Sequence, residues 1–454
     1  MFDQSFSHEN LFKIYTRENK RGVNLSERFF PDLKLQYEKI NRVRKLINKI
    51  YSRKRTYTRP VFESRVLFLY RLLRFYKNSA DTCVNKHLTN ISKKISNKNF
   101  RFEVKKSKHK IKNKDVYSTG NSVESYFAEK QMQYNIKCAC IVKQADRDMI
   151  VPQLKSILSD DFPKIIIKTD IKSFYESLNH KLLLEKLKKS NELSLTTRKI
   201  ISRMLISYKQ ESSLDKGIPR GIGVSAYLAE LYMKRFDSVV SKIENLIYYS
   251  RYVDDIILVV GRKSENDIND IYNLLESELK KESLEINKDP VKTKKIEYVF
   301  KHKKNERIEY DFDFLGYKFK FKSNSISLHL SDKKTNNYIN KIRTAIDCYN
   351  RSCIRTPNVA RKQLFLRLKF ITCNTKLFNN KKNASVGIYS SNKWLSDLSS
   401  LSNLDNILMG LIQLISNPNL RSKLTKFSFK KGFEERRYVK FSPADFHAIT
   451  KVWI

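Results

Sequence analysis

Residues 246–260 read LIYYSRYVDDIILVV, in which two adjacent carboxylates, Asp254 and Asp255, have apolar and aromatic residues on both sides. This pattern predicts two β-strands joined by a tight turn that presents the acids at its tip. No helical pairing or salt bridge is predicted to offset their charge, so we expect a cation there. A purely structural interpretation also exists, because Asp tolerates turn geometry and hydrogen-bonds its own backbone.

A third carboxylate follows a second apolar run. Residues 164–170, KIIIKTD, form a short β-branched strand that ends in Asp170, and residues 171–178 change to a helical pattern. If this strand lies beside the predicted hairpin, Asp170, Asp254 and Asp255 meet at one edge of a sheet. Such oxygen clusters suit Mg²⁺, which takes its remaining ligands from water and substrate phosphates. Two ions roughly 3.5 to 4 Å apart would activate a 3′-hydroxyl and stabilise a leaving pyrophosphate.

The charge balance indicates a polyanionic partner. The 454 residues include 90 Lys and Arg against 47 Asp and Glu, a net charge of +43. Nucleic acid is the simplest partner, because phosphate contacts supply sequence-independent affinity. Compositional drift toward Lys is the alternative, but drift alone does not explain why the acids are so few.

Cysteine usage and hydropathy indicate a cytosolic protein. The six cysteines form no CxxC pair, have no His partner at zinc spacing and show no disulfide framework, so we expect reduced thiols. The first eight residues lack the features of a signal peptide. The longest apolar stretch, near residues 407–415, is too short to span a bilayer. We therefore expect cytoplasmic localisation and no membrane role.

The N-terminal third is basic. Helical periodicity predicts helices over 33–51 and 60–76, and residues 1–60 are predicted to be a solvated arm or a docking element. The polar, basic segment 86–114 is predicted to be a finger or an RNA-contacting insertion, although most of its Lys residues have the composition of an ordinary solvated face. Residues 137–143 alternate as a strand would.

Several residues are candidates for nucleotide binding. Lys143 and Arg147, just before an amphipathic helix at 149–158, could hold a triphosphate, with ordinary surface ion pairs as the equal alternative. Tyr175, five residues after Asp170, could exclude a 2′-hydroxyl by a steric clash, or could pack in the core with Phe174.

Two later segments extend this set. Residues 217–225, GIPRGIGVS, form a Gly/Pro turn that opens a helix; Gly221 lets the backbone approach a base pair, and Arg220 could reach the nucleotide's sugar or phosphate. Lys292 is a candidate general acid for pyrophosphate. Residues 310–319 are predicted to be a strand, a turn and a strand that could grip a primer.

In order, these segments resemble the motifs of reverse transcriptases over about residues 137–320: Asp170 with Phe174 and Tyr175, Gly217 to Ser225, Tyr252 to Asp255, Lys292, and Phe314 to Tyr317. The resemblance implies an α+β right-hand polymerase, in which fingers and a palm with an antiparallel sheet precede an α-helical thumb and C-terminal region. It implies an RNA-directed DNA polymerase that uses Mg²⁺ and dNTPs. The expected domains are an arm (1–60), fingers (61–165), a palm (166–330) and a helical thumb with the C-terminal domain (331–454).

Some segments resemble one group of reverse transcriptases in particular. The loop has Pro219-Arg-Gly221 and Ser225-Ala226 where the family usually has Pro-Gln-Gly and Ser-Pro. The sequences IPRG, FYES (174–177) and RYVDD (251–255) are similar to abortive-infection and defence-associated reverse transcriptases of bacteria. Three further segments most resemble the smaller polymerase of type 3 defence systems: DQSFS at 3–7, FITCNTK at 370–376 and VGIY at 386–389. Those systems pair two polymerases with a noncoding RNA, so the resemblance implies a noncoding RNA template, a DNA product and a partner polymerase subunit.

The C-terminal region is predicted to be helical. Ser331 or Asp332 could cap a basic amphipathic helix suited to lie along a duplex. The tail 423–440 interleaves Phe427, Phe429, Phe433 and Tyr438 with Lys and Arg, a mixture that could stack on unpaired bases or form a subunit contact.

Two further hypotheses stay open at this stage. The chain could be a nucleic-acid-binding partner or abortive-infection effector whose polymerase chemistry is vestigial. It could also be an RNA-dependent RNA polymerase, although Tyr175 at the expected sugar position disfavours this.

Overall fold

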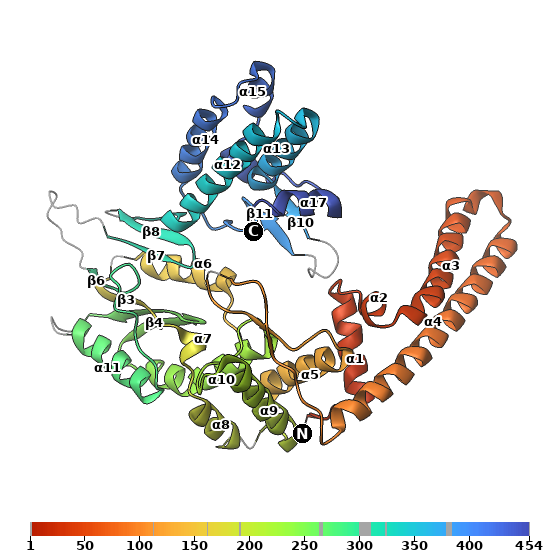
Figure 1. The fold of residues 1–454 in the computed structure, drawn as a ribbon, viewed down its shortest axis with the longest axis horizontal. Helices are drawn as coiled ribbons and strands as arrows, with labels where there is room; N and C mark the ends of the chain where they lie inside the picture. Colours follow the sequence, from red (N-terminus) through yellow and green to blue (C-terminus); the bar gives the residue numbers. More distant parts are fainter. Residues whose placement is uncertain are drawn as a thin grey trace. The chain divides into compact units, whose positions relative to one another are not determined.

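The computed structural model describes residues 2–111, 113–160, 162–189, 192–262, 267–298, 310–322, 325–377 and 384–453. The chain forms two compact units (Figure 1). The first unit consists of Met1–Gln144 and Ser173–Lys234, and the second of Ala145–Lys172 and Arg235–Ile454. Part of the first unit is therefore inserted between the two stretches of the second. No helix in these described ranges combines the length and the apolar character needed to cross a membrane.

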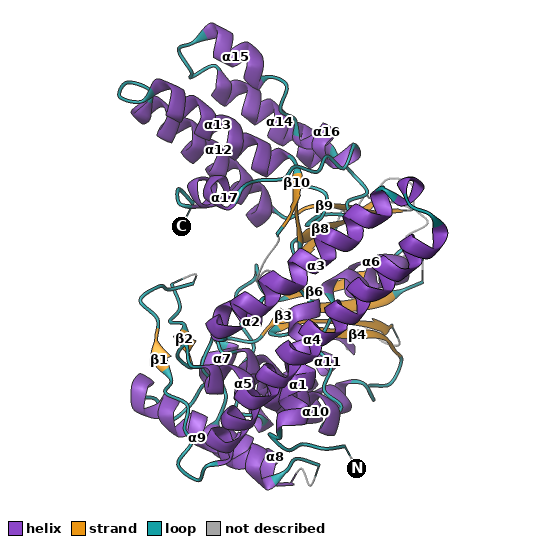
Figure 2. Cartoon of the chain, turned by 90° about the vertical axis from the view of Figure 1, so that its right-hand side faces the viewer, coloured by secondary structure: helices purple, strands orange, loops and turns teal. Residues whose placement is uncertain are grey.

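The first unit is mainly helical (Figure 2). Its elements in chain order are α1 (His8–Lys20), α2 (Leu25–Phe29), the 3-10 helix η1 (Pro31–Leu33), α3 (Lys34–Ser52), the 3-10 helix η2 (Lys54–Thr56), α4 (Arg59–Ser96), β1 (Lys105–Lys106), β2 (Tyr117–Ser118), α5 (Val123–Ala139), α7 (Phe174–Ser177), α8 (His180–Lys189), α9 (Leu195–Ser212) and the first part of α10 (Gly223–Val240).

Helices α3 and α4 pair as a hairpin, visible in Figure 1 as two long adjacent helices. Ile40 and Val43 of α3 lie in one buried cluster with Leu69 and Leu73 of α4. Both sets recur at helical spacing, so each helix presents one apolar stripe, and pairing the stripes stabilises helices that would be marginal alone. The helices predicted over 33–51 and 60–76 are confirmed.

Helix α4 is longer than predicted. Val84, Leu88, Ile91 and Ile95 are buried and continue its apolar stripe to Ser96, so residues 86–96 of the predicted finger are helical. The helix over residues 86–96 was not predicted because Lys and Asn are abundant there. Only about one apolar residue per turn marks its buried face.

The strand predicted over 137–143 is wrong. Helix α5 runs to Ala139, and Ile141 has φ +52° after the helix ends. Ile136 and Cys140 are buried while Cys138 is exposed, which is the four-residue spacing of a helix end. Over seven residues, alternation does not distinguish this pattern from a strand.

The second unit contains a four-stranded antiparallel sheet. Its order is β4 (Leu246–Tyr252), β5 (Asp255–Gly261), β3 (Lys164–Asp170) and β6 (Lys294–Tyr298). All seven residues of β3 are buried. This strand is the predicted β-branched run, and Figure 1 shows α6 (Arg147–Leu158) and α11 (Asp267–Lys281) on opposite sides of the sheet, which explains why both of its faces are apolar.

A second sheet and a helical region complete this unit. The sheet consists of β7 (Asp311–Phe314), β8 (Tyr317–Lys322) and β9 (Ser325–Leu330), so the predicted strand, turn and strand are confirmed. The elements that follow are α12 (Asp332–Ser352), α13 (Pro357–Thr372), β10 (Asn374–Lys376), β11 (Ser385–Gly387), α14 (Ser399–Ile412), α15 (Pro418–Leu424), α16 (Phe429–Glu434) and α17 (Pro443–Thr450). Ser331 caps α12, because its Oγ accepts from the Lys334 amide. The α+β class is confirmed.

Two details differ from the sequence-based expectations. The boundary predicted at residue 60 lies within the first turn of α4, which packs against α3, so residues 34–60 group with the helix that follows them. In the tail, Phe429 and Phe433 are buried in the core of the second unit and cannot stack on bases, whereas Tyr438 is 52% exposed.

Candidate active site

Three carboxylates meet at one edge of the four-stranded sheet. Asp170, the last residue of β3, pairs directly with Asp255, the first residue of β5. Directly opposed residues of an antiparallel pair project from the same face. Asp254 lies in the turn between β4 and β5, and its carbonyl oxygen accepts from the Ile171 amide at 3.0 Å. The structure thus brings Asp170 together with Asp254 and Asp255, which lie 84 and 85 residues later in the sequence.

The turn that carries Asp254 has a strained backbone conformation, and side-chain hydrogen bonds hold it in place. Val253 has φ +62°, a region that β-branched residues rarely occupy. The buried Arg251 donates from Nη1 to the Val253 carbonyl at 3.0 Å. Its Nε and Nη2 donate to the Asp237 carboxylate at 2.8 and 2.7 Å, and Tyr249 donates to the same carboxylate at 2.5 Å. Arg251 therefore connects the turn to α10.

The electrostatics of the cluster favour a cation. Burial raises the pKa of Asp255 to about 6, and repulsion from Asp254 and Asp170 adds to this effect, while Lys168 and Lys292 oppose it. The two Lys residues thus compensate the negative charge only in part. A divalent cation among the carboxylates would stabilise their ionised forms.

Lys292, the candidate general acid, lies at this cluster. Its Nζ donates to Asp170 Oδ2 at 2.9 Å. Burial lowers the pKa of Lys292, but its hydrogen bond to Asp170 and the attraction of all three carboxylates outweigh burial, so the pKa lies above its usual value. Asn287 donates from Nδ2 to Asp170 Oδ1 at 3.2 Å and from its amide to the Asp170 carbonyl at 2.8 Å, so both carboxylate oxygens of Asp170 are oriented.

The glycine-rich loop lies against Tyr175 within the first unit. Arg220 Nη2 donates to Glu176 at 3.0 Å, and its Cζ lies 4.9 Å from the centre of the Tyr175 ring. Gly217 has φ +92°, and a Cβ there would lie 3.1 Å from the Glu176 carbonyl. Gly221 has φ +100°, and a Cβ there would lie 2.7 Å from the Tyr117 carbonyl. Both positions therefore require glycine, and the loop holds Arg220 beside Tyr175.

The two predicted triphosphate ligands have different surroundings. Lys143 is exposed in the loop after α5. Arg147 donates from Nε to the Leu315 carbonyl at 2.8 Å and from Nη2 to the Ser391 carbonyl at 3.3 Å, and its Cζ lies 4.8 Å from the centre of the Tyr317 ring. These contacts join α6 to the β7–β8 turn, so we do not assign Arg147 to nucleotide binding.

Residues 91–319 match the family described as reverse transcriptase (RNA-dependent DNA polymerase). The match spans half of the chain and includes the three carboxylates, the glycine-rich loop and Lys292. The chain belongs to the reverse transcriptase family. The activity in that family's description is that of an RNA-directed DNA polymerase, a nucleotidyltransferase, and reverse transcriptases generally use divalent metal ions.

Solved structures of telomerases are similar to this reverse transcriptase. An apo telomerase from Candida tropicalis is 14% identical, with a TM-score of 0.35, covering 72% of this chain and 54% of that one. A Candida albicans telomerase, solved with the TWJ fragment of telomeric RNA, is 12% identical, with a TM-score of 0.31, covering 72% and 56%. The chain thus spans about half the length of these telomerases. A search of curated proteins finds no match.

Sequence reasoning missed Lys168 of this reverse transcriptase. Lys168 is buried on β3, and its Nζ donates to the Lys292 carbonyl at 2.7 Å. Burial lowers its pKa, against the attraction of Asp255. The signal was available, because a residue two positions before Asp170 on a strand projects from the same face. Asn287 carried no comparable signal, because only the folded loop brings it to Asp170.

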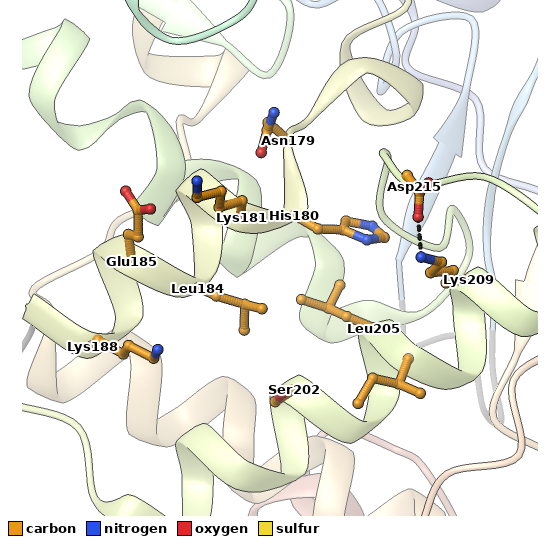
Figure 3. A pocket seen from close by; sticks show the side chains of 11 residues that line it. Asn179, His180, Lys181, Leu184, Glu185, Lys188, Ser202, Leu205, Lys209 and Asp215 are labelled. Carbon is orange, nitrogen blue, oxygen red and sulfur yellow. Dashed lines mark ion pairs between the residues drawn. The ribbon is translucent and has the colours of Figure 1, made fainter.

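The reverse transcriptase also has a hollow of about 580 Å³ between α8 and α9 (Figure 3). His180 lies in its lining, beside the ion pair of Lys209 and Asp215 that Figure 3 marks. The ring Nε2 of His180 lies 2.5 Å from the Gly217 carbonyl, and burial lowers the pKa of the ring. None of the predicted site residues lines this hollow. His180 therefore contacts the glycine-rich loop, and the hollow is not the candidate active site.

Proposed function

We propose that this reverse transcriptase copies a dedicated noncoding RNA into DNA in bacterial antiphage defence. The convergence of Asp170, Asp254 and Asp255 at one sheet edge, inside the region that matches the family, supports the catalytic part of this proposal. The similarity of IPRG, FYES and RYVDD to defence-associated enzymes supports the biological part.

The donor set fits Mg²⁺. The candidate ligands are carboxylate oxygens, and the raised pKa of Asp255 reflects burial first and then repulsion from Asp254 and Asp170. Asp170 and Asp254 would hold the two ions, with Asp255 as a secondary ligand. When bound, the ions would supply activation of the primer 3′-hydroxyl and neutralisation of the pyrophosphate.

We assign the surrounding residues to orienting Asp170 and to selecting the incoming nucleotide. Asn287 and Lys292 hydrogen-bond to the two carboxylate oxygens of Asp170. We assign Lys292 as the general acid that gives a proton to the leaving pyrophosphate. Tyr175 is assigned to excluding a 2′-hydroxyl. Arg220 and Gly221 are assigned to the incoming dNTP, and the exposed Lys143 to its phosphates.

Replacing Asp254 by Asn tests the catalytic assignment. Incorporation of labelled dNTP on a primed RNA template should fall roughly a thousandfold, equivalent to about 4 kcal/mol of transition-state stabilisation, because one charged ligand is lost. RNA binding by filter retention should be unchanged. Asp270→Asn, the same change at an exposed position of α11, is the matched control and should keep full activity. Undiminished synthesis by Asp254→Asn would refute the assignment.

Replacing Tyr175 by Ala separates a reverse transcriptase from an RNA polymerase. The preference for dNTP over NTP should fall roughly 10- to 100-fold, because the steric barrier to one oxygen is removed. Tyr227→Ala, a change on α10, is the control. Equal use of NTP and dNTP by the unchanged enzyme would contradict the proposal.

The defence assignment requires a test in cells. Nucleic acid that copurifies with the protein from its native host should contain one recurrent RNA and its DNA copy. Phage protection should be lost with Asp254→Asn and should require a second polymerase encoded nearby. If Asp254→Asn protects fully and no DNA copurifies, the chain is instead a nucleic-acid-binding effector with vestigial chemistry.

A further inference from the structure

The α3–α4 hairpin, defined here as residues 34–77, concentrates positive charge. It contains fourteen Lys and Arg against two Glu, a net charge of +12 in about a tenth of a chain whose total is +43. All fourteen cationic residues are exposed. The hairpin cannot neutralise this charge itself, because Glu63 already pairs with Arg59 at 2.8 Å and Glu38 is the remaining acid.

The same hairpin exposes large apolar side chains. Val61, Phe68 and Phe75 follow one another at seven-residue intervals, so they lie on one face of α4 and are spaced by about 10 Å. They are 43%, 63% and 66% exposed. They are separate from the buried seam of Leu69 and Leu73, so α4 has one apolar stripe against α3 and a second that is open to solvent.

Cations and rings are interleaved on this open stripe. Arg71 lies three residues after Phe68 and four before Phe75, the spacings at which helical side chains are neighbours. Nearer the tip, Arg65 Cζ lies 4.8 Å from the centre of the Tyr57 ring, and Lys54 Nζ lies 5.4 Å from that of Phe62. Charge and aromatic surface are therefore presented together along the hairpin.

The base of the hairpin is anchored within the first unit. The Oδ2 atom of Asp32 in η1 lies 2.7 Å from His87 Nε2 of α4, and Cys83 Sγ lies 3.7 Å from the same oxygen. The Phe30 ring stacks on His87 at 4.9 Å between centroids. The expectation that the cysteines have no His partner at zinc spacing is thus wrong for Cys83, because Cys83 and His87 are one helical turn apart and both contact Asp32. These contacts hold α4 against η1, so the helix that carries the open stripe is anchored within the first unit.

We propose that the open stripe of Val61, Phe68, Arg71 and Phe75 binds single-stranded RNA. Unpaired bases stack on the exposed rings, and the exposed Lys and Arg contact the phosphates. A second copy of this chain is a poor occupant, because two faces of the same high positive charge repel each other. The inference rests on the proposed function only for the identity of the RNA, which would be the template transcript.

The test compares two double variants of the full chain with matched controls. Phe68→Ser with Phe75→Ser removes the rings, and Arg71→Ser with Arg74→Ser removes two charges. The controls are Phe162→Ser with Ile354→Ser, and Lys189→Ser with Lys199→Ser, which make comparable changes at exposed positions outside the hairpin. The probes are a fluorescein-labelled 30-nucleotide oligouridine and a 15-base-pair RNA duplex, with fluorescence anisotropy measured at several salt concentrations.

The ring variant should raise the Kd for oligouridine at least tenfold and change duplex affinity much less, because only unpaired bases stack. The charge variant should reduce the slope of log Kd against log salt by about 1.4 for the single strand, since about 0.7 ion is released per phosphate contact. Both controls should stay within twofold of the unchanged protein.

Unchanged oligouridine affinity in the ring variant would overturn the proposal. So would a change in oligomeric state by light scattering at unchanged RNA affinity, which would make the stripe a protein interface. The proposed function is scored separately, by dNTP incorporation at saturating primed template. Both hairpin variants should retain that activity, whereas Asp254→Asn should lose it whatever the hairpin binds.

Discussion

Val253 and Arg251 show how a single residue position supports the candidate site. A β-branched residue at φ +62° costs of order 1 to 3 kcal/mol, and such strain persists only where the surroundings impose it. Arg251 imposes it here, because its guanidinium binds the Val253 carbonyl and the Asp237 carboxylate together. The strained turn places the Asp254 carbonyl on the Ile171 amide, next to Asp170.

Arg251→Met should therefore affect both stability and catalysis. It preserves bulk but leaves Asp237 and the Val253 carbonyl without their shared donor. We expect the free energy of unfolding, measured in urea, to fall by about 2 to 4 kcal/mol, since Arg251 is buried although Asp237 is partly exposed. Under conditions where the variant is folded, kcat should fall more than KM changes. Arg262→Met, which breaks a looser 3.6 Å pair with Glu297, is the control, and an equal loss there would contradict this account.

At the level of elements, helices and strands with strong periodicity were predictable from the sequence. Contacts between residues that are distant in sequence were not. The β3 run, the β4–β5 hairpin and α12 each carried a repeat or a cap that local chemistry determines. The convergence of the acids was predicted only on the condition that β3 lies beside the hairpin, and the pairing of Asp170 with Asp255 meets that condition. Residues 137–143 were misassigned because seven residues fit two periods equally well.

The remaining differences between prediction and structure arise because the contacts of a side chain depend on how the chain packs. Arg147 was predicted from its position near β3, but its contacts are with carbonyls of residues 315 and 391, far away in sequence. Lys168 was overlooked because a Lys inside an apolar strand looks like an interruption. Only the fold shows that its amine bonds the carbonyl of Lys292.

Helix α12 gives a prediction of pH dependence. Lys334 Nζ donates to the Ser391 carbonyl at 3.1 Å, and burial, with repulsion from Arg147, lowers its pKa to about 7. In the unfolded chain the pKa is near 10.5, so between these values the unfolded state binds more protons and stability rises with pH. Relative to Lys334→Met, the unchanged protein should gain up to about 2 kcal/mol between pH 7 and 9. Denaturant titrations at both pH values measure this, and a pH-independent difference would disprove it.

Over the whole molecule, the net charge of +43 determines how the protein responds to salt. Most of this charge is spread along both units, and the hairpin carries +12 of it. Affinity for a 30-nucleotide single-stranded RNA should fall at least roughly a hundredfold between 50 and 200 mM monovalent salt, equivalent to about five phosphate contacts. Anisotropy titrations across this range provide the measurement. A loss below threefold would show that the charge serves solubility and not RNA binding.

The order of the strands has a consequence for synthesis on the ribosome. In the described sheet the central strand β3 pairs with β5 and β6, and Asp255 is made 85 residues after Asp170. At ordinary elongation rates the nascent chain carries an unpaired Ile165-Ile-Ile167 run for roughly 4 to 17 s, while the inserted helices emerge. Fragments that end before residue 255 keep this run permanently unsatisfied, so premature termination yields aggregating products and not smaller working enzymes.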